Sequence, residues 1–95
     1  MEVKFLKTKT KVILPPECEI FAVEEAYQKL NAKKIVEKPV EIDFSKVSTI
    51  DTTFIQLIVS LIKTVKAAGK TYSIKNLSEE IKKKFELYGI DLNDL

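Results

Sequence analysis

The sequence predicts a small α/β sandwich with a mixed, largely parallel sheet of four or five strands and three or four helices. The chain has 95 residues, which is enough for one hydrophobic core. Extended segments and segments with helical periodicity follow one another in the order β-β-α-β-α-β-α. Strands separated by helices need crossover connections, which place them parallel to one another. We therefore expect residues 1–95 to form a single domain.

The first two elements are predicted to be strands and the third a helix. Residues 2–14 contain two extended runs, which would pair as a hairpin and which end at Pro15-Pro16, because proline cannot donate to a strand ladder. Residues 19–32 follow with a helical period. The residues expected on its apolar face are Ile20, Val23, Tyr27 and Leu30. A charged connector, residues 31–38, leads out of this helix.

The strand predicted for residues 39–45 alternates apolar and acidic residues. Such alternation indicates that one face of the sheet is buried while the other is at least partly wet. The two acids of the strand, Glu41 and Asp43, belong to the wetter face.

The longest predicted helix covers residues 52–68. Its apolar residues recur at offsets that place them on one face. They are Phe54, Leu57, Ile58, Leu61, Ile62 and Val65. Gly69 is well placed as the left-handed residue that ends this helix.

A further strand and a closing helix complete the fold. The strand is predicted for residues 70–75. Asn76 is the predicted cap of the closing helix, with Glu79 three residues later as in a capping box. Gly89 ends that helix.

The composition excludes several classes of chemistry. All sixteen basic residues are lysines and the net charge is only +2, which argues against a dedicated nucleic-acid binder. The chain has no histidine, and Cys18 is the only cysteine, so a Cys-His nucleophile and a cysteine-based metal site lack their residues. We expect no enzymatic activity, no metal and no cofactor. The N-terminus does not resemble a secretion signal and no segment is apolar for long enough to insert into a membrane, so we expect a cytoplasmic protein.

The triplet Asp51-Thr52-Thr53 lies where a strand-like segment gives way to the longest helix. Functional residues of open α/β sheets gather at such carboxyl ends of strands. Aspartate and threonine are also good helix caps, and a phosphate on a hydroxyl here would lie at the positive end of the helix. The local pattern by itself favours a plain cap over a regulatory site.

Four motifs in their order resemble the STAS domain family, the domain of anti-sigma factor antagonists and of sulfate-transporter tails. The resemblance covers residues 39–92 well and residues 10–38 only in the order and length of the elements. The motifs are Ile42-Asp43-Phe44-Ser45, Ile50-Asp51-Thr52-Thr53, Ala67-Ala68-Gly69-Lys70 and Leu87-Tyr88-Gly89-Ile90.

The resemblance implies a bacterial partner-switching regulator of transcription. In antagonists of this type, a kinase that is also the anti-sigma factor phosphorylates the hydroxyl residue after the Asp, and the unphosphorylated antagonist binds that kinase. By position the acceptor is Thr52, with Thr53 beside it as an open second choice. The partner-binding residues that the resemblance implies are Asp51, Thr52, Thr53, Phe54, Asp43 and Glu19. Phe54 departs from the usual glycine, and either a core position or a partner contact would suit it.

The resemblance leaves one alternative open. Stand-alone STAS proteins also look like accessory or scaffold subunits of ABC transporters, in which the Thr52 hydroxyl would act by contact rather than by receiving phosphate. Nucleotide binding is a minor variant, because the chain has only two glycines and no glycine-rich phosphate loop.

Overall fold

The computed structural model describes residues 1–30 and 33–95, and it shows an α/β domain. The elements in chain order are β1 (Glu2–Phe5), β2 (Thr10–Ile13), β3 (Glu17–Cys18), α1 (Ile20–Leu30), the 3₁₀ helix η1 (Lys33–Glu37), β4 (Val40–Asp43), β5 (Thr49–Ile50), α2 (Thr52–Ala67), β6 (Tyr72–Lys75) and α3 (Glu79–Glu86).

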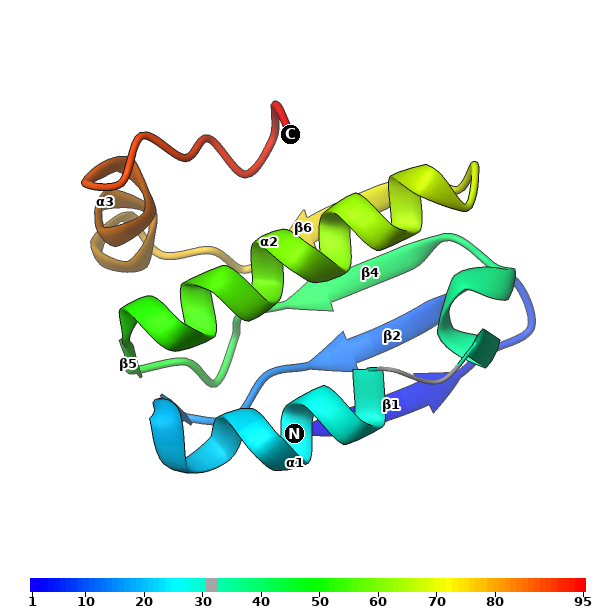
Figure 1. Cartoon of the computed structure of the whole chain (residues 1–95), viewed down its shortest axis with the longest axis horizontal. Coiled ribbons are helices and arrows are strands. Elements are labelled where there is room, and N and C mark those ends of the chain that lie inside the picture. The colour runs from blue at the N-terminus through cyan, green and yellow to red at the C-terminus, as the bar shows by residue number, and fades with distance from the viewer. Residues whose placement is uncertain (31–32) are drawn as a thin grey trace.

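The main sheet has four strands in the order β1-β2-β4-β6 (Figure 1). β1 and β2 pair antiparallel, and the expected hairpin closes with a hydrogen bond from the Leu6 amide to the Lys9 carbonyl at 2.9 Å. β2, β4 and β6 are parallel to one another. The predicted mixed, largely parallel sheet is therefore confirmed.

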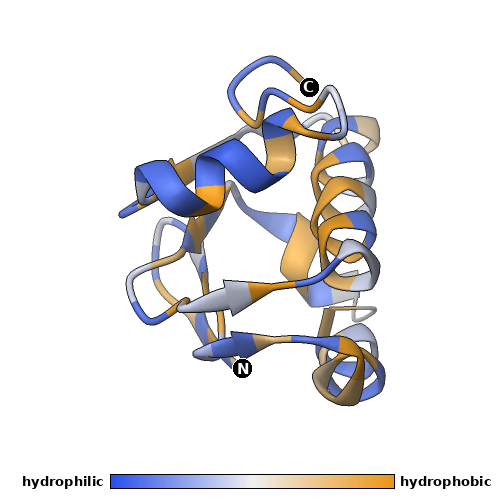
Figure 2. Ribbon diagram, turned by 90° about the vertical axis from the view of Figure 1, so that its left-hand side faces the viewer, coloured by the Kyte–Doolittle hydropathy of each residue, from blue (hydrophilic) through white to orange (hydrophobic). Residues whose placement is uncertain are grey.

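Two helices cover one face of the sheet, and the third lies at one end of it. α1 and α2 both lie in front of the sheet in Figure 1, and the view in Figure 2 places them on the same side of it. α3 lies beyond the carboxyl ends of the parallel strands (Figure 1). There its Phe85 ring meets the Phe44 ring edge-on, with the centroids 6.1 Å apart.

The core lies between the sheet and α2. The predicted stripe of α2 is confirmed, because Phe54, Ile58, Leu61, Ile62 and Val65 are buried. Leu57 of the same stripe is half-buried and packs against this core. Ile55 joins the buried set. Burial of this many large apolar side chains is the main favourable term in the folding of the domain.

The face of β4 that the sequence predicts to be wetter is more buried than expected. Glu41 and Asp43 are both buried, although they point away from the helices. Two lysines, Lys11 of β2 and Lys9 just before it, cover these acids. The Lys9 Nζ lies 2.9 Å from Glu41 Oε1, and the Lys11 Nζ lies 3.8 Å from Glu41 Oε2 and 3.9 Å from Asp43 Oδ2. The long lysine side chains shield the carboxylates while keeping their own charges in water.

Both glycines end their helices as predicted. Gly69 has a φ of 76° and Gly89 a φ of 71°, in the left-handed region. After α3, the Ile90 amide donates to the Phe85 carbonyl and the Gly89 amide to the Glu86 carbonyl. This pair of bonds defines a Schellman motif.

The predicted cap of α3 is wrong. Ser78 caps the helix, and its Oγ accepts from the Ile81 amide at 3.2 Å. Asn76 instead takes a left-handed conformation with a φ of 57°. Its side chain donates to Asp43 Oδ1 at 3.0 Å, so a tertiary hydrogen bond replaces the local cap.

The predicted buried face of α1 is also partly wrong. Ile20 and Tyr27 are exposed, while Ala26 is the buried residue and Ala22 packs against the core. Val23 and Leu30 of the predicted face pack against the core as expected. The predicted end of this helix, residues 31–32, lies outside the described residues. The connector that follows holds η1, whose Ile35 is fully buried.

Candidate functional site

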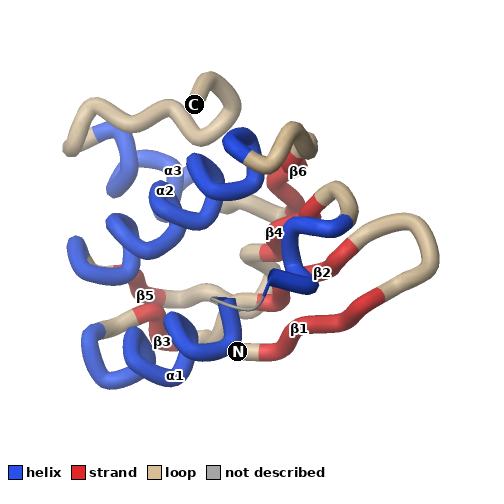
Figure 3. Tube along the Cα trace, turned by 45° about the vertical axis from the view of Figure 1, so that its right-hand side comes forward, coloured by secondary structure: helices blue, strands red, loops and turns tan. Residues whose placement is uncertain are grey.

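A second, short ladder positions the predicted site. β3 and β5 pair in parallel, with Cys18 opposite Ile50. The Asp51 amide then donates to the Cys18 carbonyl at 2.9 Å. Figure 3 shows these two strands between the first turns of α1 and α2. The ladder therefore brings the starts of two helices, far apart in the sequence, to one place.

Asp51 joins those two helix starts. Its Oδ1 accepts from the Phe54 amide at 2.9 Å and caps α2. Its Oδ2 accepts from the Ile20 amide, the first residue of α1, at 2.7 Å. Amides of a first helical turn have no partner within the helix, and the helix dipole favours an anion there. The predicted cap is confirmed, and its second partner on α1 was not anticipated.

Thr52 is the first residue of α2, and its side chain is exposed. Its Oγ1 lies 2.7 Å from the hydroxyl oxygen of Tyr88, with which it shares a hydrogen bond. Thr53 is exposed as well. Both candidate acceptor hydroxyls are therefore on the surface, and Thr52 is in contact with the turn after α3.

Glu19 lies close to the same junction. It is half-buried in the segment between β3 and α1. Its Oε1 accepts from the Thr49 hydroxyl at 3.2 Å, two residues before Asp51. The structure thus brings Glu19, Asp51 and Thr52 together at one junction.

Phe54 and Asp43 do not lie on that surface. Phe54 is 0 % exposed and belongs to the core, so the alternative of a direct partner contact does not hold for its side chain. Phe54 is buried because it begins the apolar stripe of α2. The helical period places it on the same sheet-facing side of the helix as Ile58 and Leu61.

Asp43 organises the loops at the carboxyl end of β4. It is only 6 % exposed, and its Oδ1 accepts both from the Asn76 side chain at 3.0 Å and from the Ser45 amide at 2.9 Å. The hydrogen bond from Asn76 lowers the pKa of Asp43 most, and the bond from Ser45 and the charge of Lys11 lower it further, against the opposing effect of burial. Asp43 therefore holds these loops together from within the fold.

Exposed apolar residues flank the junction, and sequence reasoning did not place them there. The largest exposures are those of Phe21 at 94 % and Leu87 at 81 %, with Ile20 and Tyr88 also exposed. Ile20 is bonded to Asp51 and Tyr88 to Thr52. We name the set Ile20, Phe21, Thr52, Leu87 and Tyr88 the Thr52 surface. The only sequence signal was their position at helix ends, where an apolar stripe begins or stops.

Cys18 is not a reactive thiol. It is fully buried, and burial raises its pKa to about 12. Its Sγ lies 3.3 Å from the Pro15 carbonyl oxygen, to which it donates. A thiol with so high a pKa has almost no thiolate at neutral pH, so Cys18 acts as a small core residue beneath the ladder.

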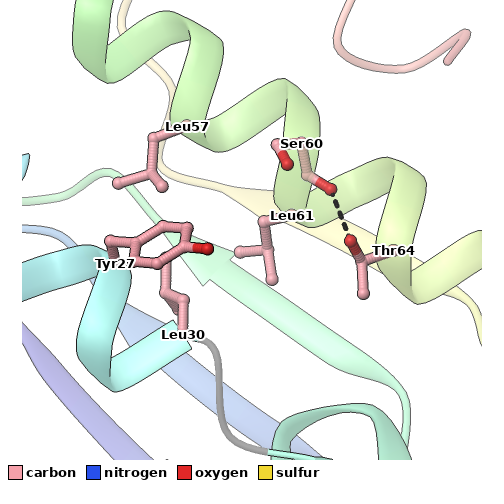
Figure 4. Close-up of a pocket in the computed structure, with 6 residues that line it drawn as sticks. All are labelled: Tyr27, Leu30, Leu57, Ser60, Leu61 and Thr64. Carbon is pink, nitrogen blue, oxygen red and sulfur yellow. Dashed lines mark hydrogen bonds between the residues drawn. The ribbon is translucent and has the colours of Figure 1, made fainter.

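A small groove lies between α1 and α2 (Figure 4). It is lined by Tyr27, Leu30, Leu57, Ser60, Leu61 and Thr64. Its volume of about 70 Å³ is far below the roughly 300–1,000 Å³ typical of small-molecule sites. The Thr64 hydroxyl is turned to the Ser60 carbonyl of its own helix at 2.9 Å. The groove has room for little more than one side chain.

Among residues 1–30 and 33–95, no group of three or more His, Cys, Asp or Glu side chains could hold a metal ion. Within the same ranges, no helix is both long and apolar enough to cross a bilayer.

Comparison with known proteins identifies the family. The chain matches the STAS domain family over residues 3–93, and it therefore belongs to that family. None of the curated protein sequences matches it.

Two solved structures share the fold. The NMR structure of the protein TM1081 superposes with a TM-score of 0.72 and 16 % identity, over 94 % of this chain and 73 % of that one. The crystal structure of Mglu gives a TM-score of 0.71 and 15 % identity, over 82 % of this chain. The match takes in 20 % of the Mglu chain, so the same fold also forms part of a longer protein. At these identities the likeness shows the fold alone.

Proposed function

We propose that this STAS domain is an anti-sigma factor antagonist that binds a kinase-type anti-sigma factor and is switched by phosphorylation at Thr52. The observation that carries the proposal is the exposed Thr52 hydroxyl at the start of α2, within a surface of exposed apolar side chains. Exposed clusters of large apolar residues are typical of protein-binding surfaces. The domain has no catalytic role in this scheme, and its function is binding.

The partner kinase would supply all of the chemistry. The Thr52 oxygen attacks the γ-phosphorus of ATP, a bond forms between them, and the bond from that phosphorus to the β-γ bridging oxygen breaks. ADP leaves, and the hydroxyl proton passes to a base of the kinase. This chain contributes only the acceptor oxygen and the surface on which the kinase docks.

Phosphorylation at Thr52 would change the electrostatics of the docking surface strongly. A phosphothreonine carries about −1.5 to −2 charges at pH 7. It would lie beside the carboxylates of Asp51 and Glu19, which the structure brings to the same junction. Burial of that charge against an apolar partner surface costs free energy unless it is paired. The phosphorylated form is therefore expected to release its partner.

The proposal is tested by mixing the domain with a kinase-type anti-sigma factor from the same genome and ATP. Mass analysis of the peptide that contains residues 52–53 identifies the acceptor. Isothermal titration without hydrolysable ATP then compares the wild type with Thr52→Ala and Thr52→Glu. We expect Thr52→Ala to bind like the wild type, and Thr52→Glu to bind about 100-fold more weakly because of its uncompensated charge.

The matched control is Thr53→Glu, which adds the same charge one residue later. Unaltered binding by Thr53→Glu together with loss in Thr52→Glu identifies Thr52 as the switch position. Equal affinities of the wild type, Thr52→Ala and Thr52→Glu would eliminate the proposed switch.

The alternative is a scaffold subunit of a transporter or signalling complex without phosphorylation. Two observations favour keeping it: the Thr52 hydroxyl is bonded to Tyr88, and the same fold occurs within the longer Mglu chain. In this case the hydroxyl acts by contact, so Thr52→Ala would weaken binding as much as Thr52→Glu. Copurification with a membrane ATPase, in place of a soluble kinase, would support the scaffold.

A further inference from the structure

The hydroxyl of Thr52 is held by a residue from another part of the chain. Its Oγ1 and the Tyr88 oxygen are 2.7 Å apart, and the two residues are 36 positions apart in the sequence. Both side chains are exposed, so the contact is not forced by burial. A hydrogen bond between two exposed side chains persists only when the backbone holds both groups in place, because otherwise the entropy cost of ordering them dominates.

The backbone around Tyr88 meets that condition. The Tyr88 amide donates to the Phe85 carbonyl at 3.0 Å, and the Schellman motif at Gly89 closes the turn. Phe85 is 1 % exposed and anchors the turn in the core. On the other side, Asp51 fixes the first turn of α2 and hence Thr52. The two hydroxyls are therefore brought together by two independently anchored elements.

Phosphate on Thr52 would be incompatible with this arrangement. A separation of 2.7 Å between the two oxygens leaves no room for a phosphorus atom and its three further oxygens on that side of Thr52. The Tyr88 hydroxyl must then turn away, or move to donate to a phosphoryl oxygen in a stronger, charge-assisted bond. Either response moves the tyrosine side chain.

We propose that Tyr88 couples the chemical state of Thr52 to the turn of residues 87–90, so that phosphorylation alters the Leu87–Tyr88 side of the Thr52 surface as well as Thr52 itself. This inference rests on the proposed function and adds a positioning residue to it. Leu87 is the neighbour of Tyr88 in that turn and is 81 % exposed. A partner that contacts Leu87 would therefore sense phosphorylation without touching Thr52.

The coupling is measured in the isolated domain by amide hydrogen exchange in a double-mutant cycle. Thr52→Val and Tyr88→Phe each remove one hydroxyl and keep the side-chain shape. The amides of residues 87–90 are all hydrogen-bonded to α3 carbonyls and therefore report on the turn. We expect each single variant to speed their exchange by about two- to tenfold, the range of one lost hydrogen bond. The double variant should exchange no faster than either single one, because the same bond is lost in all three.

The effect of a negative charge at position 52 is measured by NMR, with phosphothreonine introduced there during translation or with Thr52→Glu. In the Tyr88 background both changes should shift the amide resonances of residues 87–90. In the Tyr88→Phe background those shifts should be clearly smaller, because the hydroxyl that carries the coupling is gone. Gln56→Glu and Tyr27→Phe are the matched controls, since they add a charge one turn further along α2 and alter an exposed tyrosine outside the Thr52 surface.

Additive effects in the cycle, or shifts of equal size with and without the Tyr88 hydroxyl, would overturn the coupling. These experiments need no partner protein, so their failure is separate from failure of the proposed function. Partner binding that depends on Thr52 but not on Tyr88 would overturn only the inference that a partner senses phosphorylation through the turn of residues 87–90. If the turn of residues 87–90 responds to a change at residue 52 but phosphorylation leaves the affinity for the partner unchanged, the proposed switch is overturned and the coupling stands.

Discussion

Replacement of Asp51 by alanine removes the caps of two helices at once. The Asp51 carboxylate accepts from the Phe54 amide of α2 and from the Ile20 amide of α1. Loss of an N-cap side chain costs about 1 kcal/mol, and a hydrogen bond to a charged acceptor contributes roughly 1.5–3 kcal/mol, less when it is solvated. Asp51 is half-buried, so we expect Asp51→Ala to lower the free energy of unfolding by about 2–3 kcal/mol.

Urea denaturation followed by circular dichroism measures this change. A domain of this length has a total stability of about 5–14 kcal/mol, so the variant should remain folded. Asp51→Asn retains one acceptor oxygen and should lose about half as much. The matched control is Ser78→Ala, because Ser78 caps α3 with a single bond and its loss should cost about 1 kcal/mol.

The reasoning requires Asp51→Ala to cost clearly more than Ser78→Ala. If the two costs were equal, Asp51 would act as an ordinary single cap, and the bond to α1 would contribute nothing. Amide exchange gives the local test: the Ile20 and Phe54 amides should both lose protection in Asp51→Ala, and Ile42 in the central strand should change only with the global stability.

Two further predictions concern buried polar groups of the sheet. Thr10 is fully buried, and its hydroxyl has no hydrogen-bond partner among the described residues. Thr10→Val should therefore raise the free energy of unfolding by about 1 kcal/mol and the melting temperature by roughly 4–8 °C. Thr71→Val on the surface is the control and should change neither. A loss of stability in Thr10→Val would contradict the conclusion that the buried hydroxyl has no partner within the described part of the chain. The pKa of Asp43 is lowered on folding, chiefly by the hydrogen bond from Asn76, so its stabilisation is present above the pKa of the unfolded chain and is lost as pH falls through the lower, folded value. Acid titration of stability should show a smaller loss below about pH 4 in Asn76→Gly, which removes the donor and keeps the left-handed backbone, than in the wild type; equal losses would show that the bond does not perturb Asp43.

Several features were predictable because they depend on near neighbours in the sequence. The stripe of α2 follows from the helical period, and both glycine terminations follow from the need for a left-handed residue. The identity of Asp51 as a cap follows from its short side chain just before the helix. The position of Thr52 on the surface follows too, because the first residue of an amphipathic helix precedes its apolar stripe.

The incorrect predictions each involve a choice between similar local patterns. In α1 the stripe through Ile20 and Tyr27 and the stripe through Ala22 and Ala26 have the same period, so period alone does not say which one faces the core. The same holds for the start of α3. Asn76 and Ser78 are both good caps, and the buried carboxylate of Asp43 draws the Asn76 side chain away from the helix.

The sequence by itself determined the order of the elements, the fold class, the apolar face of α2 and the junction at which Asp51 and Thr52 lie, because each depends on periodicity or on a turn of a few residues. Only the tertiary structure decided that Asp51 serves two helices, that Tyr88 holds the Thr52 hydroxyl, and that Phe21 and Leu87 are left exposed around it. Those features join residues about 30 or more positions apart, and such contacts depend on how the β3–β5 ladder and α3 pack at the carboxyl end of the sheet.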